Sequence, residues 1–397
     1  MRFAFRVLFP VLLLLSSGCE YSVIDPALKR IMGPTSSGDN PYLSGSDPAA
    51  IITTPTLKPG TPASGPRDSY LIYSAVTGLN DPTDVAFDGN DNLFIAERGS
   101  HRIRRVSPQG RMEYYAGDGF QDQETHAGRY NGDGDALKMS FYGPCALAVD
   151  PIGNLFVADS YNQRVREVTK ESRILTVAGN GEPAYVGDGR AATAASLKLP
   201  AGLAIDPFGN LYVADSGNHR IRMVDQAGIM STVVGKGIDG FTDNRPRSDA
   251  LLNYPAGISF DTLGNLYIAD RLNHRIRKVD LGGTITTVAG NGSATGPSEN
   301  AGDNGLATEA SLSYPQDVVV DRYGFLYIAD TGHHRIRRVD PQSKKIRTIA
   351  GNGFPGVTGD SGPAIDARLN FPSGLAVGSD GCLYVADSSN NRIRKLQ

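Results

Sequence analysis

The sequence repeats one unit six times, and this repetition restricts the fold more than any other feature. One copy runs from Pro200 to Asp225, and related copies begin at Pro82, Pro144, Pro255, Pro315 and Pro372. In the copy at Pro200, apolar runs at 203–205 and 211–214 flank a Pro-Phe-Gly-Asn turn, and β-prone runs follow at 220–224 and 229–234. Four short strands at a period of about 55 to 62 residues predict an all-β fold, a six-bladed β-propeller of four-stranded antiparallel blades.

The ends of the repeat array indicate how such a ring would close. The sixth copy stops after its third strand at Leu396, and the segment Leu71 to Val76 ahead of the first copy has the pattern of an isolated fourth strand. We therefore expect the N-terminal strand to complete the last blade, which removes an exposed sheet edge from both segments.

Each copy also carries an acidic residue at the end of its second strand and an arginine five residues later. An arginine between packed blades requires a carboxylate partner, because burying an unpaired charge is very costly. We predict six structural ion pairs: Glu97–Arg102, Asp159–Arg164, Asp215–Arg220, Asp270–Arg275, Asp330–Arg335 and Asp387–Arg392.

Three copies contain the tetrapeptides Asn218-His219-Arg220-Ile221, Asn273-His274-Arg275-Ile276 and His333-His334-Arg335-Ile336. They resemble the motif that names NHL repeats, and the resemblance extends over residues 69–397. It implies a propeller fold but no single function, because proteins of this family include RNA-binding and protein-binding scaffolds, sensor domains and an amidating lyase.

The lyase of that family holds a metal in its central channel with histidines, whereas the starts of the first strands contain no histidine here. Those positions are occupied by Asp84, Ala146, Gly202, Gly257, Asp317 and Gly374. Asp84 and Asp317 are candidate ligand-binding residues that could bind a cation, act as an acid–base pair or cap turns. An alternative hypothesis for the function, a metal-dependent lyase or hydrolase acting at the channel mouth, is based on these two aspartates.

Other catalytic and metal sites find less support in the sequence. His101, His219, His274 and His334 occupy equivalent positions on successive blades, too far apart to share one zinc ion. The matching Gln163 and Asn391 favour a turn-stabilising role for this position. No nucleophile motif is present, so we predict no catalytic residue, no metal site and no cofactor, and whether the chain is an enzyme stays open.

Five long inserts of 19 to 26 residues join each blade to the next, whereas only three residues separate Gly78 from Pro82. We expect the inserts to crowd a single face and to end in one helical turn whose leucine packs on the blades. Four of them contain a Gly-Asp element whose aspartate could ligate calcium or cap a turn: Asp133, Asp188, Asp303 and Asp360.

Aromatic residues gather in these inserts and supply large, rigid contact surfaces. The candidate ligand-binding tyrosines are Tyr130, Tyr142, Tyr185, Tyr254 and Tyr314. We therefore predict a binding or scaffold module whose insert-bearing face holds a protein, peptide or polysaccharide partner. A structural spacer is the third hypothesis.

The N-terminus has the features of a lipoprotein precursor. Arg2 and Arg6 precede an apolar run at 7–15 that is shorter than the ~20 residues of a membrane-spanning helix, and small residues lead to Cys19. Leu14-Leu15-Ser16-Ser17-Gly18-Cys19 resembles the bacterial lipobox, although Ser16 departs from the usual leucine; an ordinary secretory signal is the alternative. We predict a signal peptide at 1–18, lipidation at Cys19, a disordered Pro/Ser/Gly-rich tether at 19–68 and the propeller at 69–397, in a bacterial cell envelope on the periplasmic side or the cell surface.

Charge and cysteine content restrict partners further. The formal net charge is −3, which argues against nucleic acid as a partner because phosphate binding requires a basic excess. We expect a monomer that contacts the membrane only through its lipid. Cys145 and Cys382 fall in non-adjacent copies and should remain two separate, buried thiols.

Overall fold

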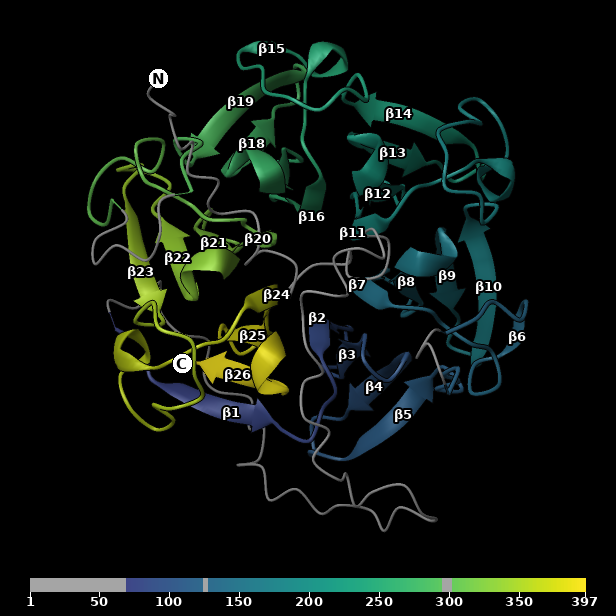
Figure 1. The fold of residues 1–397 in the computed structure, drawn as a ribbon, viewed down its shortest axis with the longest axis horizontal. Coiled ribbons are helices and arrows are strands. Elements are labelled where there is room, and N and C mark those ends of the chain that lie inside the picture. The colour runs from purple at the N-terminus through teal and green to yellow at the C-terminus, as the bar shows by residue number, and fades with distance from the viewer. Residues whose placement is uncertain (1–68, 124–127, 295–301) are drawn as a thin grey trace, which may run out of the picture.

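The fold is known from a computed structural model, which describes residues 69–123, 128–294 and 302–397. Six antiparallel sheets stand around a central axis, each with its first strand innermost (Figure 1). Blade 1 consists of β2 (Pro82–Phe87), β3 (Leu93–Glu97), β4 (Arg102–Val106) and β5 (Met112–Ala116). Blade 2 consists of β7 (Pro144–Val149), β8 (Leu155–Asp159), β9 (Arg164–Val168), β10 (Arg173–Ala178) and the short β6 (Gly134–Asp135).

The next three blades repeat this order around the ring. Blade 3 consists of β11 (Pro200–Ile205), β12 (Leu211–Asp215), β13 (Arg220–Val224) and β14 (Met230–Val234). Blade 4 consists of β16 (Pro255–Phe260), β17 (Leu266–Asp270), β18 (Arg275–Val279), β19 (Thr284–Ala289) and the short β15 (Arg245–Pro246). Blade 5 consists of β20 (Asp317–Val320), β21 (Leu326–Asp330), β22 (Arg335–Val339) and β23 (Ile346–Ala350). The predicted six-bladed propeller is confirmed, with a short fifth strand added to blades 2 and 4.

Blade 6 closes the ring with a strand from the opposite end of the chain. It consists of β24 (Pro372–Val377), β25 (Leu383–Asp387), β26 (Arg392–Leu396) and β1 (Ile72–Val76). β1 pairs antiparallel with β26, and Ile72 lies opposite Leu396 in the register. The predicted closure is confirmed, and it joins the two termini of the described propeller by backbone hydrogen bonds.

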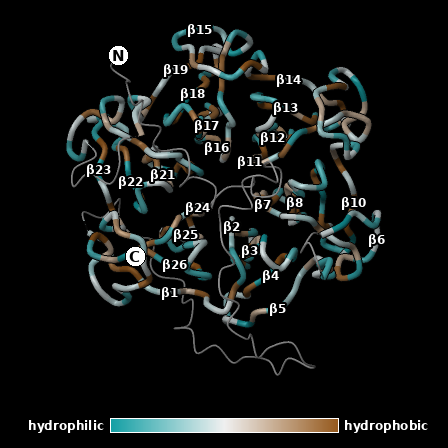
Figure 2. The backbone as a smooth tube through the Cα atoms, in the orientation of Figure 1, coloured by the Kyte–Doolittle hydropathy of each residue, from teal (hydrophilic) through white to brown (hydrophobic). Residues whose placement is uncertain are grey.

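Apolar strand residues fill the spaces between neighbouring blades. Six buried clusters each draw on two adjacent blades, and the cluster between blades 6 and 1 joins Ile393 to Ile95. Hydrophobic positions fall within the blades, whereas the outer loops are largely hydrophilic (Figure 2). Each blade therefore buries its neighbours' faces, which is why a repeat of this kind is stable only as a complete ring.

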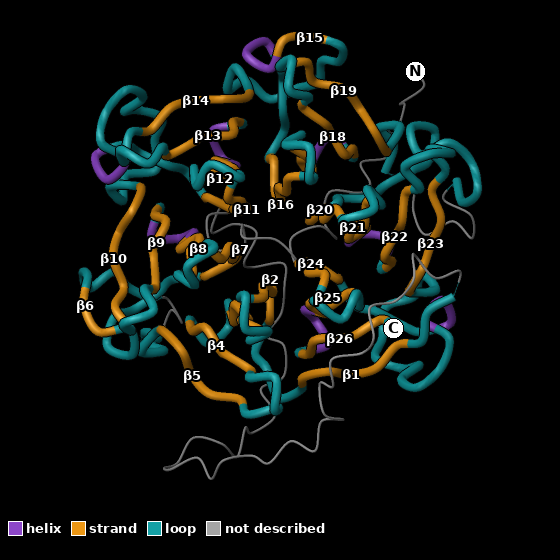
Figure 3. Tube along the Cα trace, turned by 180° about the vertical axis from the view of Figure 1, so that it is seen from behind, coloured by secondary structure: helices purple, strands orange, loops and turns teal. Residues whose placement is uncertain are grey.

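The connections define two ends of the ring. Fourth strands end and first strands begin at one end, called here the insert end; the turns after first and third strands lie at the opposite end, called the turn end. Single-turn 3-10 helices join second to third strands at the insert end (Figure 3): η2 (Ser160–Asn162), η4 (Ser216–Asn218), η6 (Arg271–Asn273), η7 (Thr331–His333) and η9 (Ser388–Asn390).

The inserts do not crowd one face, and this expectation was wrong. Each insert runs down the outer edge of the blade that follows it and then returns to the insert end. The insert before blade 2 contributes β6, which pairs with β10, and the insert before blade 4 contributes β15, which pairs with β19. The reason is the fourth strand, whose outer edge would otherwise expose unpaired backbone groups.

The ends of the inserts agree with prediction. One helical turn precedes the next blade in three inserts: η3 (Ala192–Ala194), η5 (Arg247–Asp249) and η8 (Ala364–Asp366). A leucine near the end of the insert is fully buried before blades 3 to 6, whereas the insert before blade 2 buries Phe141 and exposes Leu137; the buried leucines are Leu197, Leu252, Leu312 and Leu369.

Two further predictions concern the cysteines and the N-terminus. Cys145 and Cys382 are buried thiols that are not joined in a disulfide, as expected. The signal peptide, Cys19 and the tether lie outside the described residues. Within the described part of the chain, no helix has the length and apolar character needed to cross a membrane.

Candidate functional site

The predicted ion pairs exist, but with a different arginine. Each acidic residue at the end of a second strand pairs with the arginine seven residues later rather than five. The observed pairs are Glu97–Arg104 (2.7 Å), Asp159–Arg166 (3.5 Å), Asp215–Arg222 (3.1 Å), Asp270–Arg277 (2.9 Å), Asp330–Arg337 (3.0 Å) and Asp387–Arg394 (3.3 Å). The six pairings with Arg102, Arg164, Arg220, Arg275, Arg335 and Arg392 were wrong.

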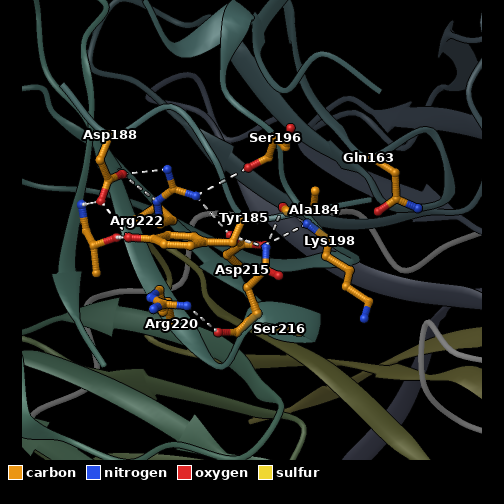
Figure 4. Close-up of polar contacts among 12 residues, drawn as sticks. Gln163, Ala184, Tyr185, Asp188, Ser196, Lys198, Asp215, Ser216, Arg220 and Arg222 are labelled. Atoms are coloured by element: carbon orange, nitrogen blue, oxygen red, sulfur yellow. Dashed lines mark hydrogen bonds and ion pairs between the residues drawn. The ribbon is translucent and has the colours of Figure 1, made fainter. Parts of the chain in front are cut away.

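Blade 3 shows the reason for this difference (Figure 4). Arg220 lies opposite Asp215 in the strand register, but its guanidinium extends outward and donates to the carbonyl oxygens of Asn218 and Lys236. Arg222 is fully buried beside the carboxylate. Burial raises the pKa of Asp215 to about 6, and hydrogen bonds from Asn218 and Lys198, together with the Arg222 charge, oppose this shift. The carboxylate is therefore ionised at pH 7.

A second carboxylate, from the preceding insert, pairs with each buried arginine in blades 2 to 6. Asp188 lies 2.5 Å from Arg222 Nη2, and its other oxygen accepts the Thr232 backbone N–H at 3.1 Å (Figure 4). The equivalent pairs are Asp133–Arg166, Asp243–Arg277, Asp303–Arg337 and Asp360–Arg394. These aspartates join insert to blade, a role that differs from both the calcium and the turn-capping hypotheses. Asp243 was missed because its insert reads Thr-Asp instead of Gly-Asp.

Two of the candidate tyrosines belong to the same arrangement. Tyr130 and Tyr185 are each 40% exposed, and their rings stack on Arg164 at 3.8 Å and Arg220 at 3.6 Å. The Tyr185 hydroxyl also donates to Asp188. These contacts hold the inserts against the blades, so the ring faces toward the arginines are already occupied.

The NHL-motif histidines form hydrogen bonds between blades. Nδ1 of each accepts the backbone N–H of the residue just before the next blade's first proline, at 3.1 to 3.2 Å. The four pairs are His101–Gly143, His219–Tyr254, His274–Tyr314 and His334–Phe371. Gln163 and Asn391 accept the equivalent N–H groups of Leu199 and Asp81. This shared acceptor role explains why His, Gln and Asn alternate at one position, and it agrees with the predicted structural role.

Three of these histidines, His219, His274 and His334, have a pKa below the usual range. Burial lowers the pKa of His274 and of His334 to about 4, and it also lowers the pKa of His219. A neutral imidazole leaves Nδ1 free to accept the N–H, whereas protonation would remove the acceptor.

Aromatic residues lie just ahead of the first strands of four blades, at the insert end of the ring. Tyr142, Tyr254, Tyr314 and Phe371 are half-buried and lie edge-on to His101, His219, His274 and His334, with ring centroids 4.4 to 5.4 Å apart. Three of the predicted tyrosines thus occupy equivalent positions on separate blades, and the set of Tyr142, Tyr254, Tyr314 and Phe371 is called here the aromatic mouth. Tyr130 and Tyr185 lie elsewhere, on the outer edges of blades 2 and 3.

The two candidate aspartates line a central cavity of about 260 Å³. Asp84 accepts the backbone N–H groups of Val85 and Leu147, and Asp317 accepts those of Val318 and Leu375. Each carboxylate thus bridges its own blade to the next. Burial raises the pKa of Asp317 to about 7, although both backbone N–H groups lower it.

Glycine makes room for these carboxylates. A Cβ atom at Gly374 would lie 2.2 Å from Asp84 Oδ1, and one at Gly257 would lie 2.0 Å from Asp317 Oδ1. Asp84 and Asp317 therefore lie on either side of β24. Among the described residues, no group of three or more His, Cys, Asp or Glu side chains is placed to hold a metal ion.

Fold and repeat define the class as closed six-bladed propellers built from NHL-type units. The teneurin NHL domain family matches residues 47–169 and 176–250, and the NHL repeat family matches residues 252–279, 312–339 and 369–396. The chain belongs to the NHL-repeat family.

Similar proteins include large eukaryotic ones. The chain is 32% identical to Protein SUPPRESSOR OF QUENCHING 1, chloroplastic, of Arabidopsis thaliana, over 81% of this chain and 31% of that protein. It is 33% identical to teneurin-4 of Homo sapiens, over 91% of this chain and 14% of that protein. The chain thus spans less than a third of either relative.

A solved structure shares the fold. An auxiliary nutrient binding protein from Bacteroides thetaiotaomicron has a TM-score of 0.58 at 18% identity, over 85% of this chain and 74% of that chain.

Proposed function

We propose that this chain is a binding or scaffold module, anchored by lipid at Cys19 in a bacterial cell envelope, that holds a protein, peptide or polysaccharide partner. Membership of the NHL-repeat family supports a binding role, and the nutrient binding protein from Bacteroides thetaiotaomicron shows this fold in a protein described as binding. The lipid anchor is inferred from the lipobox-like sequence that ends at Cys19, and the partner's binding site is inferred from the aromatic residues at the insert end.

The observation that carries the proposal is the aromatic mouth. Four aromatic side chains sit at equivalent positions on four blades, each fixed by an edge-on contact with a histidine or phenolic neighbour and each still half-exposed. Rigid, partly exposed aromatic rings bind partners at low entropic cost, because few rotamers remain to be lost. We therefore place the partner on the insert end of the ring.

The channel geometry favours binding over catalysis. Asp84 and Asp317 each use both carboxylate oxygens to accept backbone N–H groups. A general base or metal ligand requires a lone pair directed at its substrate or ion. Each of these two carboxylates instead joins its own first strand to that of the next blade, a structural role from which the lyase or hydrolase alternative gains no support.

Site-specific photo-crosslinking tests where the partner binds. Tyr314→p-benzoylphenylalanine places the probe in the mouth, and Phe208→p-benzoylphenylalanine places it at the turn end, where Phe208 is 77% exposed. We expect a discrete adduct in cells from position 314 and none from position 208. Equal labelling at both positions, or no adduct from position 314, would refute a mouth-bound partner.

The anchor is tested separately. Intact-mass analysis of the mature protein should show Cys19 as the first residue with diacylglycerol and acyl additions, and Cys19→Ser should release the protein from membranes. A mature chain with unmodified residues ahead of Cys19 would exclude lipidation there.

A further inference from the structure

Five blades have their outer edges paired with an insert, and the pairing follows one pattern. In blade 3, Met230 donates its backbone N–H to Arg190 and accepts that of Gly189, at 2.9 and 2.8 Å. In blade 5, Ile346 donates to Gly305 and accepts from Asn304; in blade 6, Ile72 donates to Gly362 and accepts from Ser361. β6 and β15 make the equivalent antiparallel pairs in blades 2 and 4.

Blade 1 has no such insert. Only three residues separate Gly78 from Pro82, too few for an insert that could run down the edge of blade 1. Met112 takes the position of Met230, because Met112 lies opposite Val106 as Met230 lies opposite Val224. Among the described residues β5 pairs with β4 alone, so the outward backbone groups of Met112 form an open strand edge.

The buried arginine of blade 1 differs in the same way. Arg104 contacts one carboxylate, Glu97, and otherwise the Tyr114 hydroxyl at 3.2 Å and the Met112 sulfur at 3.8 Å. Its side chain is 15% exposed, whereas the equivalent arginines with two carboxylates are 0% exposed. A guanidinium with two weak neutral acceptors has room for a second carboxylate.

We propose that the outer edge of β5 binds an extended peptide segment of a partner protein as an antiparallel fifth strand, with an aspartate of that segment paired to Arg104. The five inserts define the peptide: a Gly-Asp or Thr-Asp element, then residues directly after the aspartate whose backbone pairs with the strand edge, and then a buried apolar side chain, which is a leucine in four of the five inserts. Main-chain pairing supplies affinity, and the Arg104–aspartate contact supplies selectivity. This site is separate from the aromatic mouth, so the two proposals stand or fall independently.

A peptide copied from the chain's own inserts tests the proposal. The probe is a fluorescently labelled peptide with the sequence of residues 355–369, which contains the blade 6 element at Asp360; its matched control carries asparagine at that aspartate. We expect saturable binding to the mature chain by anisotropy, weakened about tenfold for the asparagine peptide, because a charge-assisted contact is lost.

Two variants locate the binding on β5. Met112→Pro removes the outward N–H at the first residue of an edge strand, where proline is tolerated, and should weaken binding about tenfold or more. Met112→Leu retains the N–H and should bind like the parent. Equal binding to Met112→Pro, or equal affinity for the two peptides, would overturn the proposal.

The chain's own sequence provides the competing occupant. Gly38-Asp39-Asn40 repeats Gly302-Asp303-Asn304 and lies outside the described residues. Binding of the peptide to the Asp39→Asn chain but not to the parent would assign the edge to that segment and refute a partner in trans.

Discussion

The inter-blade histidines predict a specific loss of stability in acid. His274 and His334 accept a backbone N–H as neutral rings, and burial lowers the pKa of each to about 4. The unfolded chain has the ordinary value of about 6.5 and so binds protons more readily than the folded chain between these limits. The stability contributed by these rings is therefore complete above about pH 6.5 and lost as the pH falls toward 4.

The size of the effect follows from the two shifts. Two pKa shifts of this size lower the free energy of unfolding by about 5 kcal/mol between pH 7 and pH 4.5. Both rings are partly exposed, and solvent screening reduces this to about 2 to 4 kcal/mol. In a folded unit of some 330 residues, that difference moves the melting midpoint by roughly 3 to 6 °C.

Calorimetry of the parent chain and a His274→Gln, His334→Gln variant at both pH values measures this contribution. Gln163 already makes the same hydrogen bond, with its amide oxygen 2.7 Å from the Leu199 nitrogen, so the variant retains the inter-blade contact without a titrating group. Buried aspartates titrate in both proteins and cancel in the comparison. An equal acid shift of the midpoint in the two proteins would refute the reasoning.

Three substitutions test the packing of the ring by the same calorimetric measurement. Leu197→Ala, at a 0% exposed position in the insert before blade 3, should lower the free energy of unfolding by about 2 to 5 kcal/mol. A loss below about 1 kcal/mol would contradict the place of Leu197 in the core. Asp215→Ala should cost about 3 to 5 kcal/mol because it leaves Arg222 buried with one carboxylate; a neutral effect would show that Asp188 alone suffices. Gly257→Ala should cost about 1 to 3 kcal/mol, since its Cβ would meet a channel carboxylate at 2.0 Å, whereas Gly89→Ala, with open space around it, should be silent.

The ring itself could be predicted from sequence because its determinants are local and repeated. Each copy carries its own alternating strands and turns, and six copies leave little doubt about blade number. The closing strand at Ile72–Val76 was predictable for a different reason: the last copy lacks a fourth strand, and one unassigned strand remained at the other terminus.

Side-chain partners were harder to predict, as the ion pairs show. Spacing in sequence correctly placed Arg220 opposite Asp215 in the backbone register. It could not show that the Arg220 guanidinium extends to carbonyl groups outside the strand while Arg222 turns inward. Two arginines two residues apart on one strand look equally suitable in sequence, and only their different neighbours in the fold separate them.

The inserts illustrate the same limit at the level of the backbone. Their length was evident, but their path along the outer edges depends on hydrogen bonds to strands that are distant in the chain. The aspartate that fixes this path pairs with an arginine about 34 residues away, as Asp188 does with Arg222. Such a pairing has no local signal, which is why the Gly-Asp elements suggested turn caps or calcium.

Ring closure and the open edge of blade 1 have a common cause. Because β1 completes blade 6, the chain must pass directly from β1 to β2, and three residues leave no length for an insert. Blade 1 compensates within its own fourth strand, where Tyr114 stacks on Arg102 and Arg104 as insert aromatics do in blades 2 to 4. Tyr114 replaces the aromatic ring of an insert but supplies neither the second carboxylate nor the backbone pairing. Among the described blades, blade 1 alone therefore leaves both the second carboxylate's place beside Arg104 and the strand edge at Met112 open to a segment from another molecule.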